Sequence, residues 1–182
     1  MAAASSWFGK MLGKALTLGN LNDLLVQQLE DLYSAEDQLI KALPKMAQAA
    51  SSSRLKTAFE AHLQDTMQHK QRLEKALQGL GAKPGGEKCE AMAGLISEGN
   101  EIATTLGDPD VKDAALIAAA QRVEHYEIAG YGCARTFARR LGRDDIAQLL
   151  QETLQNEVET DRLLTEIAES SANPAAAATA KE

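Results

Sequence analysis

Residues 20–50 read NLNDLLVQQLEDLYSAEDQLIKALPKMAQAA and carry the clearest indication of the fold. The leucines of this stretch recur every three, four or seven residues, the spacing of one face of an α-helix, and they are Leu25, Leu29, Leu32, Leu39 and Leu43. Asn20 stands where an N-cap is needed, with Asp23 in the first turn. Pro44 falls inside the pattern and is predicted to kink or loosen the last turns. The stretch therefore predicts a long helix with one apolar face.

Glu36 interrupts this apolar face, four residues after Leu32 and three before Leu39. Burying an unpaired ionised carboxylate costs several kcal/mol. An acid where a leucine is expected therefore indicates that something in the interior neutralises it.

The same periodicity predicts four more helices, over about residues 53–79, 88–106, 109–141 and 144–170. Ser, Gly and Pro residues separate them; Asp108 is the predicted N-cap before Pro109, and Asp144 is predicted to cap the last helix. Short links join the first two and the last two long helices, so each pair is expected to be antiparallel. About thirty residues separate the pairs, enough for a crossover along the bundle.

These features predict an all-α, ferritin-like four-helix bundle with a crossover helix between the two helical hairpins. The alternative is a simple up-down bundle in which the helix over residues 88–106 is a fifth packed element. We expect residues 20–170 to form the bundle, residues 1–19 a flexible extension, and the low-complexity residues 171–182 a disordered tail. The first segment has no continuous apolar run, so a secretory signal is not expected; a short amphipathic docking segment is the alternative to an extension.

The net charge of −7 argues against nucleic acid or an anionic membrane as the main partner. No stretch approaches the roughly 20 apolar residues of a membrane span. Cys89 and Cys133 form no CxxC pair, and reduced thiols in a reducing compartment are their simplest interpretation. We therefore expect a cytoplasmic protein.

The other long helices also carry polar groups on their apolar faces. These groups are His62, Asp65 and His69, then Glu124 and Glu127, then Glu157 and Asp161. Few of the 19 basic residues lie on these faces, Arg72 being the nearest. Because converging carboxylates repel one another unless they are neutralised, divalent cations are the expected remedy.

The predicted metal ligands are Glu36, His62, Asp65, His69, Glu124, Glu127, Glu157 and Asp161. A binuclear site in a bundle is normally built from a Glu on each of two helices and Glu-x-x-His on each of the others. No Glu-x-x-His occurs here, and histidine comes from one helix only. Oxygen and imidazole ligands favour iron or manganese over zinc.

Each candidate also has a structural explanation. Glu127 alone is often an interhelical hydrogen-bond partner, and His62 or His69 alone is more often a structural histidine; either could be the ligand. Glu124 and His125 are neighbours in the sequence, so one of them is expected to point inward and the other outward.

Four further residues near the candidates are expected to be structural. Tyr33 and Tyr131 each lie about one turn from a predicted ligand and are predicted to be core residues rather than redox groups. Gly130 and Gly132 stand inside a predicted helix, where glycine costs about 1 kcal/mol relative to alanine. Close packing of another helix is the predicted reason for both.

Four strings carry a resemblance to a known family: LNDLLVQQLEDLYSAEDQL (21–39), KCEAMAGLISEGNE (88–101), DAALIAAAQRVEHYEIAGYG (113–132) and LLQETLQNEVETD (149–161). They resemble the bacterial YciE/YciF-like family of ferritin-like proteins over about residues 18–169. The resemblance implies a ferritin-like bundle, usually dimeric, associated with general stress responses and without a defined activity.

The resemblance also assigns residues. The family's characteristic acids correspond to Glu36, Asp65, Glu127, Glu157 and Asp161, and its histidine and Glu-His-Tyr-Glu run correspond to His62 and residues 124–127. Two positions depart from the pattern. Asp65 stands where the family usually has Glu, and Gln64 where it often has a second acid.

Two functions are consistent with these residues. The first is a di-metal oxidoreductase-type protein that acts on a small oxidant, dioxygen or peroxide, at metals held by the ligands above. The second is a non-catalytic homodimeric stress protein that binds partners or sequesters metal. An iron-storage cage is disfavoured, because the tail is expected to be disordered and the fifth C-terminal helix of cage-forming ferritins is not expected. The sequence assigns no catalytic residue beyond the metal ligands and does not decide between the first two functions.

Overall fold

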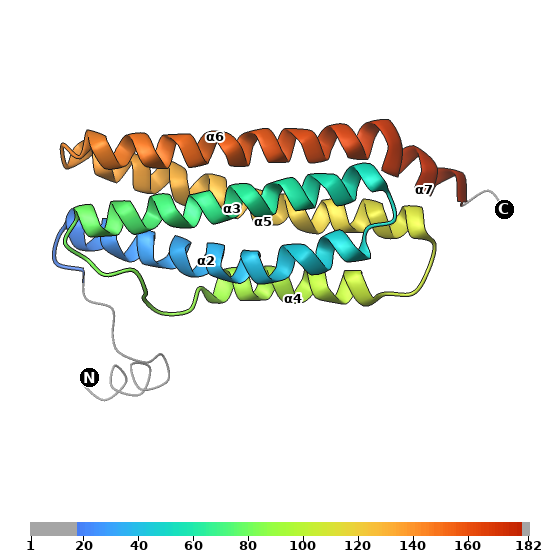
Figure 1. Ribbon diagram of the computed structural model, residues 1–182, viewed down its shortest axis with the longest axis horizontal. Helices are drawn as coiled ribbons and strands as arrows, with labels where there is room; N and C mark the ends of the chain where they lie inside the picture. Colours follow the sequence, from blue (N-terminus) through green and yellow to red (C-terminus); the bar gives the residue numbers. More distant parts are fainter. Residues whose placement is uncertain (1–17, 180–182) are drawn as a thin grey trace, which may run out of the picture.

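The computed structural model describes residues 18–179 (Figure 1). Its elements are α2 (Leu21–Ala49), α3 (Ser53–Gly79), α4 (Glu90–Thr104), α5 (Pro109–Arg140), α6 (Asp144–Ile167), the π-helical segment η1 (Ala168–Ala172) and α7 (Asn173–Thr179). No strand occurs in this part of the chain. The all-α prediction is confirmed.

The four long helices form two antiparallel hairpins, α2 with α3 and α5 with α6 (Figure 1). The hairpins lie side by side, so that α3 packs against α6 and α2 against α5. Helix α4 runs along the outside of the bundle, in contact with α2 and α5, and returns the chain to the end where α3 began. As a result α3 and α5 run in the same direction, which confirms the ferritin-like crossover and excludes the simple up-down alternative.

Side-chain caps define most of the helix starts. The Asn20 side chain accepts a hydrogen bond from the Asp23 backbone N–H at 3.0 Å, and Asp108 accepts one from Val111 at 3.0 Å. Both caps agree with the sequence prediction. The predicted cap at Asp144 is wrong: Arg143 occupies the N-cap position without a side-chain capping bond, and Asp144 is the first residue of α6.

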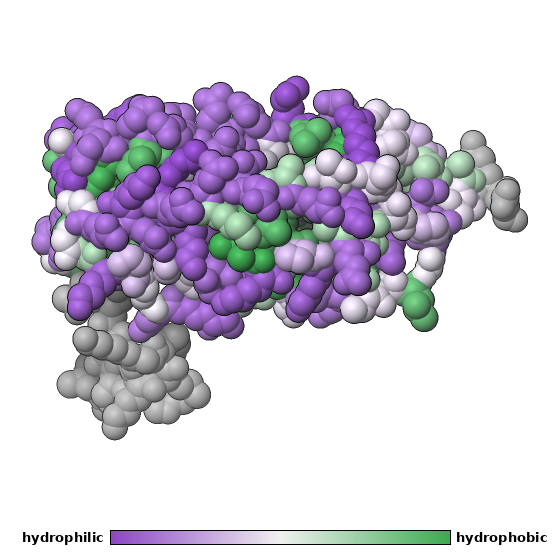
Figure 2. Space-filling model, viewed as in Figure 1, coloured by the Kyte–Doolittle hydropathy of each residue, from purple (hydrophilic) through white to green (hydrophobic). Residues whose placement is uncertain are grey.

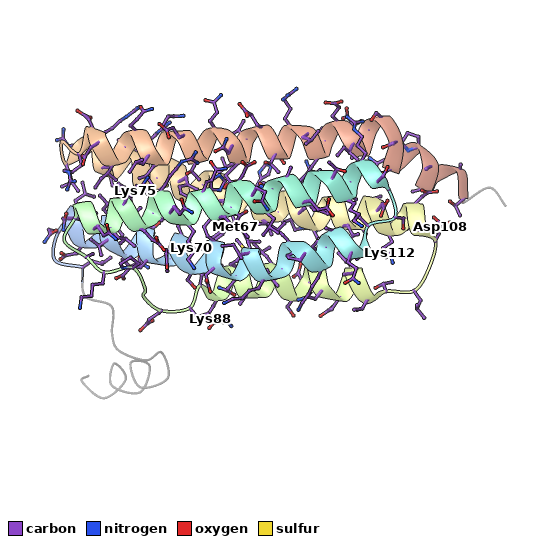
Figure 3. The ribbon with its side chains drawn as sticks, viewed as in Figure 1. Met67, Lys70, Lys75, Lys88, Asp108 and Lys112 are labelled. Atoms are coloured by element: carbon purple, nitrogen blue, oxygen red, sulfur yellow. The ribbon has the colours of Figure 1, made fainter. Side chains whose placement is uncertain are left out.

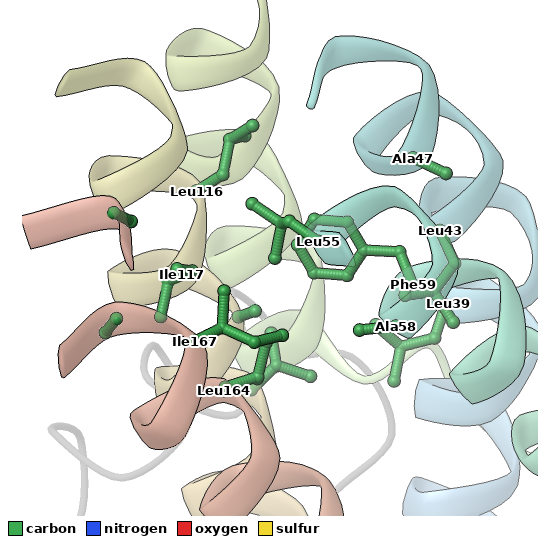
Figure 4. Packing of buried hydrophobic residues seen from close by; sticks show 14 of the residues in the cluster. Leu39, Leu43, Ala47, Leu55, Ala58, Phe59, Leu116, Ile117, Leu164 and Ile167 are labelled. Atoms are coloured by element: carbon green, nitrogen blue, oxygen red, sulfur yellow. The ribbon is translucent and has the colours of Figure 1, made fainter. Parts of the chain in front are cut away.

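The apolar core is divided into two clusters along the bundle. Figure 4 shows the first, in which Leu39 and Leu43 of α2 meet Phe59 of α3 and Ile167 of α6 closes one side. The second lies toward the other end of the bundle, and it includes Leu25, Leu29, Leu73, Leu77, Tyr131, Ala138, Ile146 and Leu150. Four buried glutamates, Glu36, Glu124, Glu127 and Glu157, lie between the two clusters.

Two interior glycines have different roles. A Cβ on Gly130 would lie 2.8 Å from Leu32 Cδ2, so α5 approaches α2 closely there, as predicted. A Cβ on Gly132 would meet nothing within 4 Å, and the same prediction is wrong for that residue. No contact in the structure explains Gly132.

The C-terminal segment continues as helix through η1 and α7 to Thr179, with Ala168 and Ala172 buried. The disordered tail predicted from residue 171 is therefore wrong up to that point. The predicted N-terminal extension and docking segment lie outside the described residues, apart from positions 18 and 19.

The surface of the bundle is mainly hydrophilic, with small separate hydrophobic patches on the face shown in Figure 2. Lys75 and Lys88, labelled in Figure 3, are both exposed. No helix within residues 18–179 is long and apolar enough to cross a membrane.

Candidate metal centre

Six ionisable side chains from the four long helices meet between the two apolar clusters. They are Glu36 of α2, His62 and His69 of α3, Glu124 and Glu127 of α5, and Glu157 of α6. We call these six residues the acid–histidine cluster. None is more than 3% exposed, so the cluster lies wholly in the interior.

The cluster contains two overlapping groups of ligand atoms. In each group the atoms lie within 4.8 Å of one another; the first group is His62, Glu124, Glu127 and Glu157, and the second is Glu36, His69 and Glu157. Glu157 belongs to both. Each group could hold a metal ion, and the two groups share one carboxylate.

The two oxygens of Glu157 face different histidines. Oε1 lies 2.9 Å from His69 Nδ1, and Oε2 lies 4.0 Å from His62 Nε2. Each histidine has a second acid beside it: His69 Nδ1 is 3.5 Å from Glu36 Oε1, and His62 Nε2 is 3.3 Å from Glu124 Oε1. Glu157 therefore stands between two histidine–carboxylate pairs.

Many of these atoms have no partner with hydrogen-bond geometry. The unpartnered atoms are Glu36 Oε2, His62 Nε2, His69 Nδ1, Glu124 Oε2 and both carboxylate oxygens of Glu127 and of Glu157. A buried polar atom without a partner costs about 1–3 kcal/mol, and a charged one costs more. Eight such atoms within one cluster are hard to reconcile with a purely structural role.

Burial and mutual repulsion raise the pKa of three of the acids. The pKa values of Glu124 and Glu127 stand well above the ordinary 4.5, and that of Glu36 rises to about 7. Burial would also raise the pKa of Glu157, but contact with His69 and the nearby His62 ring lower it instead. In the absence of a cation, protons on these carboxyl groups relieve part of the repulsion.

The two histidines differ in protonation. Burial lowers the pKa of His62 below its ordinary 6.5. Burial acts in the same direction on His69, but Glu157 and Glu36 overcome it and raise its pKa to about 10. A bound cation would supply the positive charge that the proton on His69 supplies here.

Neighbouring side chains orient the histidine rings. His69 Nε2 lies 3.3 Å from Asn156 Oδ1, which also accepts a hydrogen bond from Arg72 Nη1 at 3.0 Å. His62 Nδ1 lies 3.4 Å from Thr160 Oγ1. In both rings the other nitrogen faces the acids, which is how outer partners usually orient metal-binding histidines.

The sequence pattern does not single out Asn156 or Thr160. A usable signal exists, because each stands within one turn of Glu157 on the same helix. Tyr131 was predicted to be a core residue, and it is fully buried, but its hydroxyl also donates a hydrogen bond to Glu36. Tyr33 is only partly buried, and its hydroxyl donates to Glu74 at 3.1 Å.

Two of the predicted ligands lie outside the cluster. Asp65 is half-buried on the wall of a surface groove, and Asp161 accepts a hydrogen bond from Gln121 at 3.0 Å. The inward face of α3 runs through His62, Thr66 and His69. A step of three residues from His62 to Asp65 turns the side chain about 60° away from that face.

The structure separates Glu124 from His125 as expected, since Glu124 is 2% exposed and the side chain of His125 is 70% exposed. Basic residues do not neutralise the cluster. In residues 18–179 the Lys and Arg side chains that form salt bridges pair with acids outside it, as Lys70 does with Asp37 at 2.7 Å. Arg72, the nearest basic residue by sequence, contacts Asn156 and lies 3.7 Å from Glu152.

Residues 20–177 match the model of a family described as a domain of unknown function, DUF892. The chain belongs to this family. It is 44% identical over 159 residues to protein YciF of Escherichia coli strain K12, covering 87% of this chain and 96% of that protein. The resemblance to the YciE/YciF-like family is thus confirmed.

Several solved structures have a similar fold. The E. coli stress protein YciF superposes with a TM-score of 0.83 over 86% of this chain and 99% of that one, and YcfI of Rhodopseudomonas palustris, 40% identical, with 0.80 over 84% and 98%. A ferritin-like, diiron-carboxylate protein of Bacillus anthracis strain Ames matches with a TM-score of 0.65 over 83% of this chain and 99% of that one. At 17% identity that likeness shows the ferritin-like fold alone.

Proposed function

We propose that this protein binds two divalent metal ions, iron or manganese, in the acid–histidine cluster and acts on dioxygen or peroxide there. The observation that carries the proposal is the set of eight buried atoms without hydrogen-bond partners, all in the same cluster. Two divalent cations would neutralise the four carboxylates and use these lone pairs. When bound, redox-active ions of this kind supply the electrons that reduce a small oxidant.

The inventory of donors supports a binuclear site. Bundle sites of this class use four carboxylates and two histidines, with Glu-x-x-His on two helices. The acid–histidine cluster has the same total, but both histidines come from α3 and two glutamates come from α5. The chain therefore lacks Glu-x-x-His but offers the same number of carboxylates and histidines, distributed differently among the helices.

The proposed roles follow from the two groups of ligand atoms. His62, Glu124 and Glu127 would help to hold one ion and Glu36 and His69 the other, and Glu157 would be available to both. Carboxylate oxygens and imidazole nitrogens without thiolate favour iron or manganese. Asp65 and Asp161 are not needed for this set.

The wider role of the protein belongs to the same proposal. The E. coli relative is described as a stress protein, and we assign this chain to a stress response in the cytoplasm, as a homodimer. The negative net charge of −7 favours a role without nucleic acid or membrane partners.

Metal sequestration without turnover is the second candidate function. The observation that favours it is the burial of all six proposed ligands, none more than 3% exposed. A closed site of this kind exchanges its metal slowly, which suits storage as well as catalysis.

Metal loading tests the proposal. The purified chain is loaded with ferrous iron or Mn²⁺ without oxygen, and metal is counted by elemental analysis. We expect two ions per chain in the wild type and in the matched control Glu159→Gln, which alters an exposed acid on the same helix. Glu157→Gln removes the shared ligand and is expected to leave at most one ion.

The outcomes separate the two functions. Fewer than one ion per wild-type chain, or two ions in Glu157→Gln, would contradict the proposed site. Exposure of the iron-loaded wild type to oxygen or peroxide then distinguishes turnover, seen as rapid oxidation of the iron, from sequestration, in which the iron stays reduced.

A further inference from the structure

An apolar cavity adjoins the acid–histidine cluster. It lies between α2, α3, α4 and α5 and has a volume of about 40 Å³. Its walls include Leu43, Phe59, Ile96, Ala119 and Val123. Figure 4 shows Leu43 and Phe59 close together in the first apolar cluster.

The cavity meets the cluster at His62 and Glu124, which both line it. They are 3% and 2% exposed, and His62 Nε2 and Glu124 Oε2 have no hydrogen-bond partner. Asn100 is the other polar residue of the lining. A molecule in the cavity would therefore have hydrocarbon on most sides and one ligand pair of the proposed metal site on the remaining side.

The size of the cavity limits its occupant. About 10–15 Å³ of such volume is enough for one water molecule, and cavities lined by hydrocarbon alone stay dry but accept apolar guests such as xenon. The available 40 Å³ suits a molecule of a few atoms. Peroxide would find hydrogen-bond partners only at His62, Glu124 and Asn100, and a hydroxyl group placed against the remaining, hydrocarbon walls would cost about 1–3 kcal/mol while unpaired.

Polar species have a different approach to the same histidine. A surface groove between α3 and α6, the α3–α6 groove, is lined by Ala58, Ala61, His62, Asp65, Asn156, Glu159, Thr160, Arg162 and Leu163. His62 thus lines both the apolar cavity and this groove, in which Asp65, Glu159 and Arg162 supply charged groups.

We propose that the apolar cavity is a binding site for dioxygen and places it beside His62 and Glu124 at the metal centre. The inference rests on the proposed function. It selects dioxygen over peroxide as the oxidant that reaches the metal centre through the apolar cavity. The occupant is set by the volume, by the hydrocarbon walls and by the contact with the acid–histidine cluster.

Xenon, an apolar atom that is easily located, tests the cavity in metal-free protein. Crystals of the wild type, Ala119→Leu and Ala118→Leu are pressurised with xenon and compared. Ala119 lines the cavity, whereas Ala118 is exposed on the same helix and carries the same substitution as a control. We expect xenon between Phe59, Ile96 and Val123 in the wild type and in Ala118→Leu, and its loss in Ala119→Leu.

A second variant that fills the cavity keeps the test decisive if Ala119→Leu does not fold. A Cβ on Gly99 would lie 3.7 Å from Met46 Sδ, an ordinary contact, so Gly99→Leu fills the cavity from α4. It is expected to exclude xenon as well. A wild-type cavity without xenon, or filled variants that retain it there, would overturn the binding site.

Loaded protein tests delivery to the metal centre. Metal content should be equal in the wild type, Ala119→Leu and Ala118→Leu. Oxygen consumption by the iron-loaded protein should fall about tenfold in Ala119→Leu. Dioxygen is about the size of one or two methylene groups, and burial of an apolar group of that size contributes about a factor of ten in affinity. Equal rates in Ala119→Leu and Ala118→Leu would refute delivery. Xenon binding in a wild type that takes up no metal would refute the proposed function and leave the cavity site standing.

Discussion

Glu157 connects the two halves of the acid–histidine cluster, because its two oxygens face two different histidines. The tighter contact, 2.9 Å to His69, accompanies a raised pKa on the histidine and a lowered pKa on the acid. Charge therefore separates within this pair even without a metal. The other three acids keep raised pKa values, since one protonated histidine cannot neutralise four carboxylates.

Removing the two predicted ligands that lie outside the cluster tests the assignment residue by residue. Asp65→Asn and Asp161→Asn are expected to bind as much metal as the wild type, because neither carboxylate is among the grouped ligand atoms. Glu124→Gln, a change of the same kind inside the cluster, is expected to lower the metal content. Elemental analysis after anaerobic loading measures all three. Loss of metal in Asp161→Asn would place that acid among the ligands.

At the scale of the elements, a buried acid holds the first hairpin to the second. Asp113 of α5 is 2% exposed and accepts hydrogen bonds from the backbone N–H groups of Ser51 and Ser52, at 2.8 and 2.6 Å. These residues form the turn between α2 and α3. The contact has no signature in the sequence, since the partners are 61 and 62 residues apart.

Asp113→Ala is expected to lower the free energy of unfolding by about 2–3 kcal/mol, because two backbone N–H groups lose their acceptor, a buried carboxylate. Asp113→Asn keeps one acceptor oxygen and should lose less. Chemical denaturation measures both variants, with Asp110→Ala as the control on an exposed acid of the same helix. An effect of Asp113→Ala no larger than that of the control would show that the turn is held by other contacts.

The two glycines inside α5 give a matched pair of substitutions. Gly132→Ala is expected to raise the free energy of unfolding by about 1 kcal/mol, the helix-propensity difference, because its Cβ meets open space. Gly130→Ala should gain less or lose stability, since its Cβ would lie 2.8 Å from the buried Leu32 side chain. Denaturant unfolding of the two variants measures both free energies of unfolding. An equal increase in both would mean that α5 and α2 can move apart at Gly130 without loss of stability.

For the whole molecule, the cluster makes the metal-free protein sensitive to pH. The pKa of His69 is raised from 6.5 to about 10, so its stabilising proton is lost from the folded state as pH rises toward 10. Glu36, raised to about 7, Glu124 and Glu127 act in the same direction, because an acid with a raised pKa stabilises the fold only while it stays protonated. The lowered pKa of His62 acts oppositely, but only below about pH 6.5, where the unfolded chain binds the proton.

The metal-free protein is therefore expected to lose about 1–3 kcal/mol of stability between about pH 7 and 9. Thermal or denaturant unfolding across this range, with a chelator present, measures the loss. With Mn²⁺ bound the trend should reverse, since cations compete with protons for the same ligands. A metal-free stability that rises over this range would contradict the assigned protonation of His69.

Much of the fold could be predicted from the sequence, because its determinants are local. The leucine spacing from Leu25 to Leu43, the cap at Asn20 and the break at Pro109 each act within a few residues, and the observed helices begin and end close to the predicted positions. The C-terminal helix escaped prediction for the converse reason. Its alanine-rich sequence resembles a low-complexity tail, and the burial of Ala168 and Ala172 against the bundle is a tertiary contact.

The amino-acid pattern is sufficient to predict which helices form and that each long helix carries a charged or imidazole side chain at the same depth. Which of these side chains meet depends on how the helices pack. Glu124 enters the cluster, while Asp65 and Asp161 turn toward the surface or a neighbour, although all three lie about one turn from a cluster residue. The reason is that packing against the other helices fixes the rotation of each helix about its own axis. A difference of a few tens of degrees about the helix axis decides whether a side chain points into the interior or toward the surface groove.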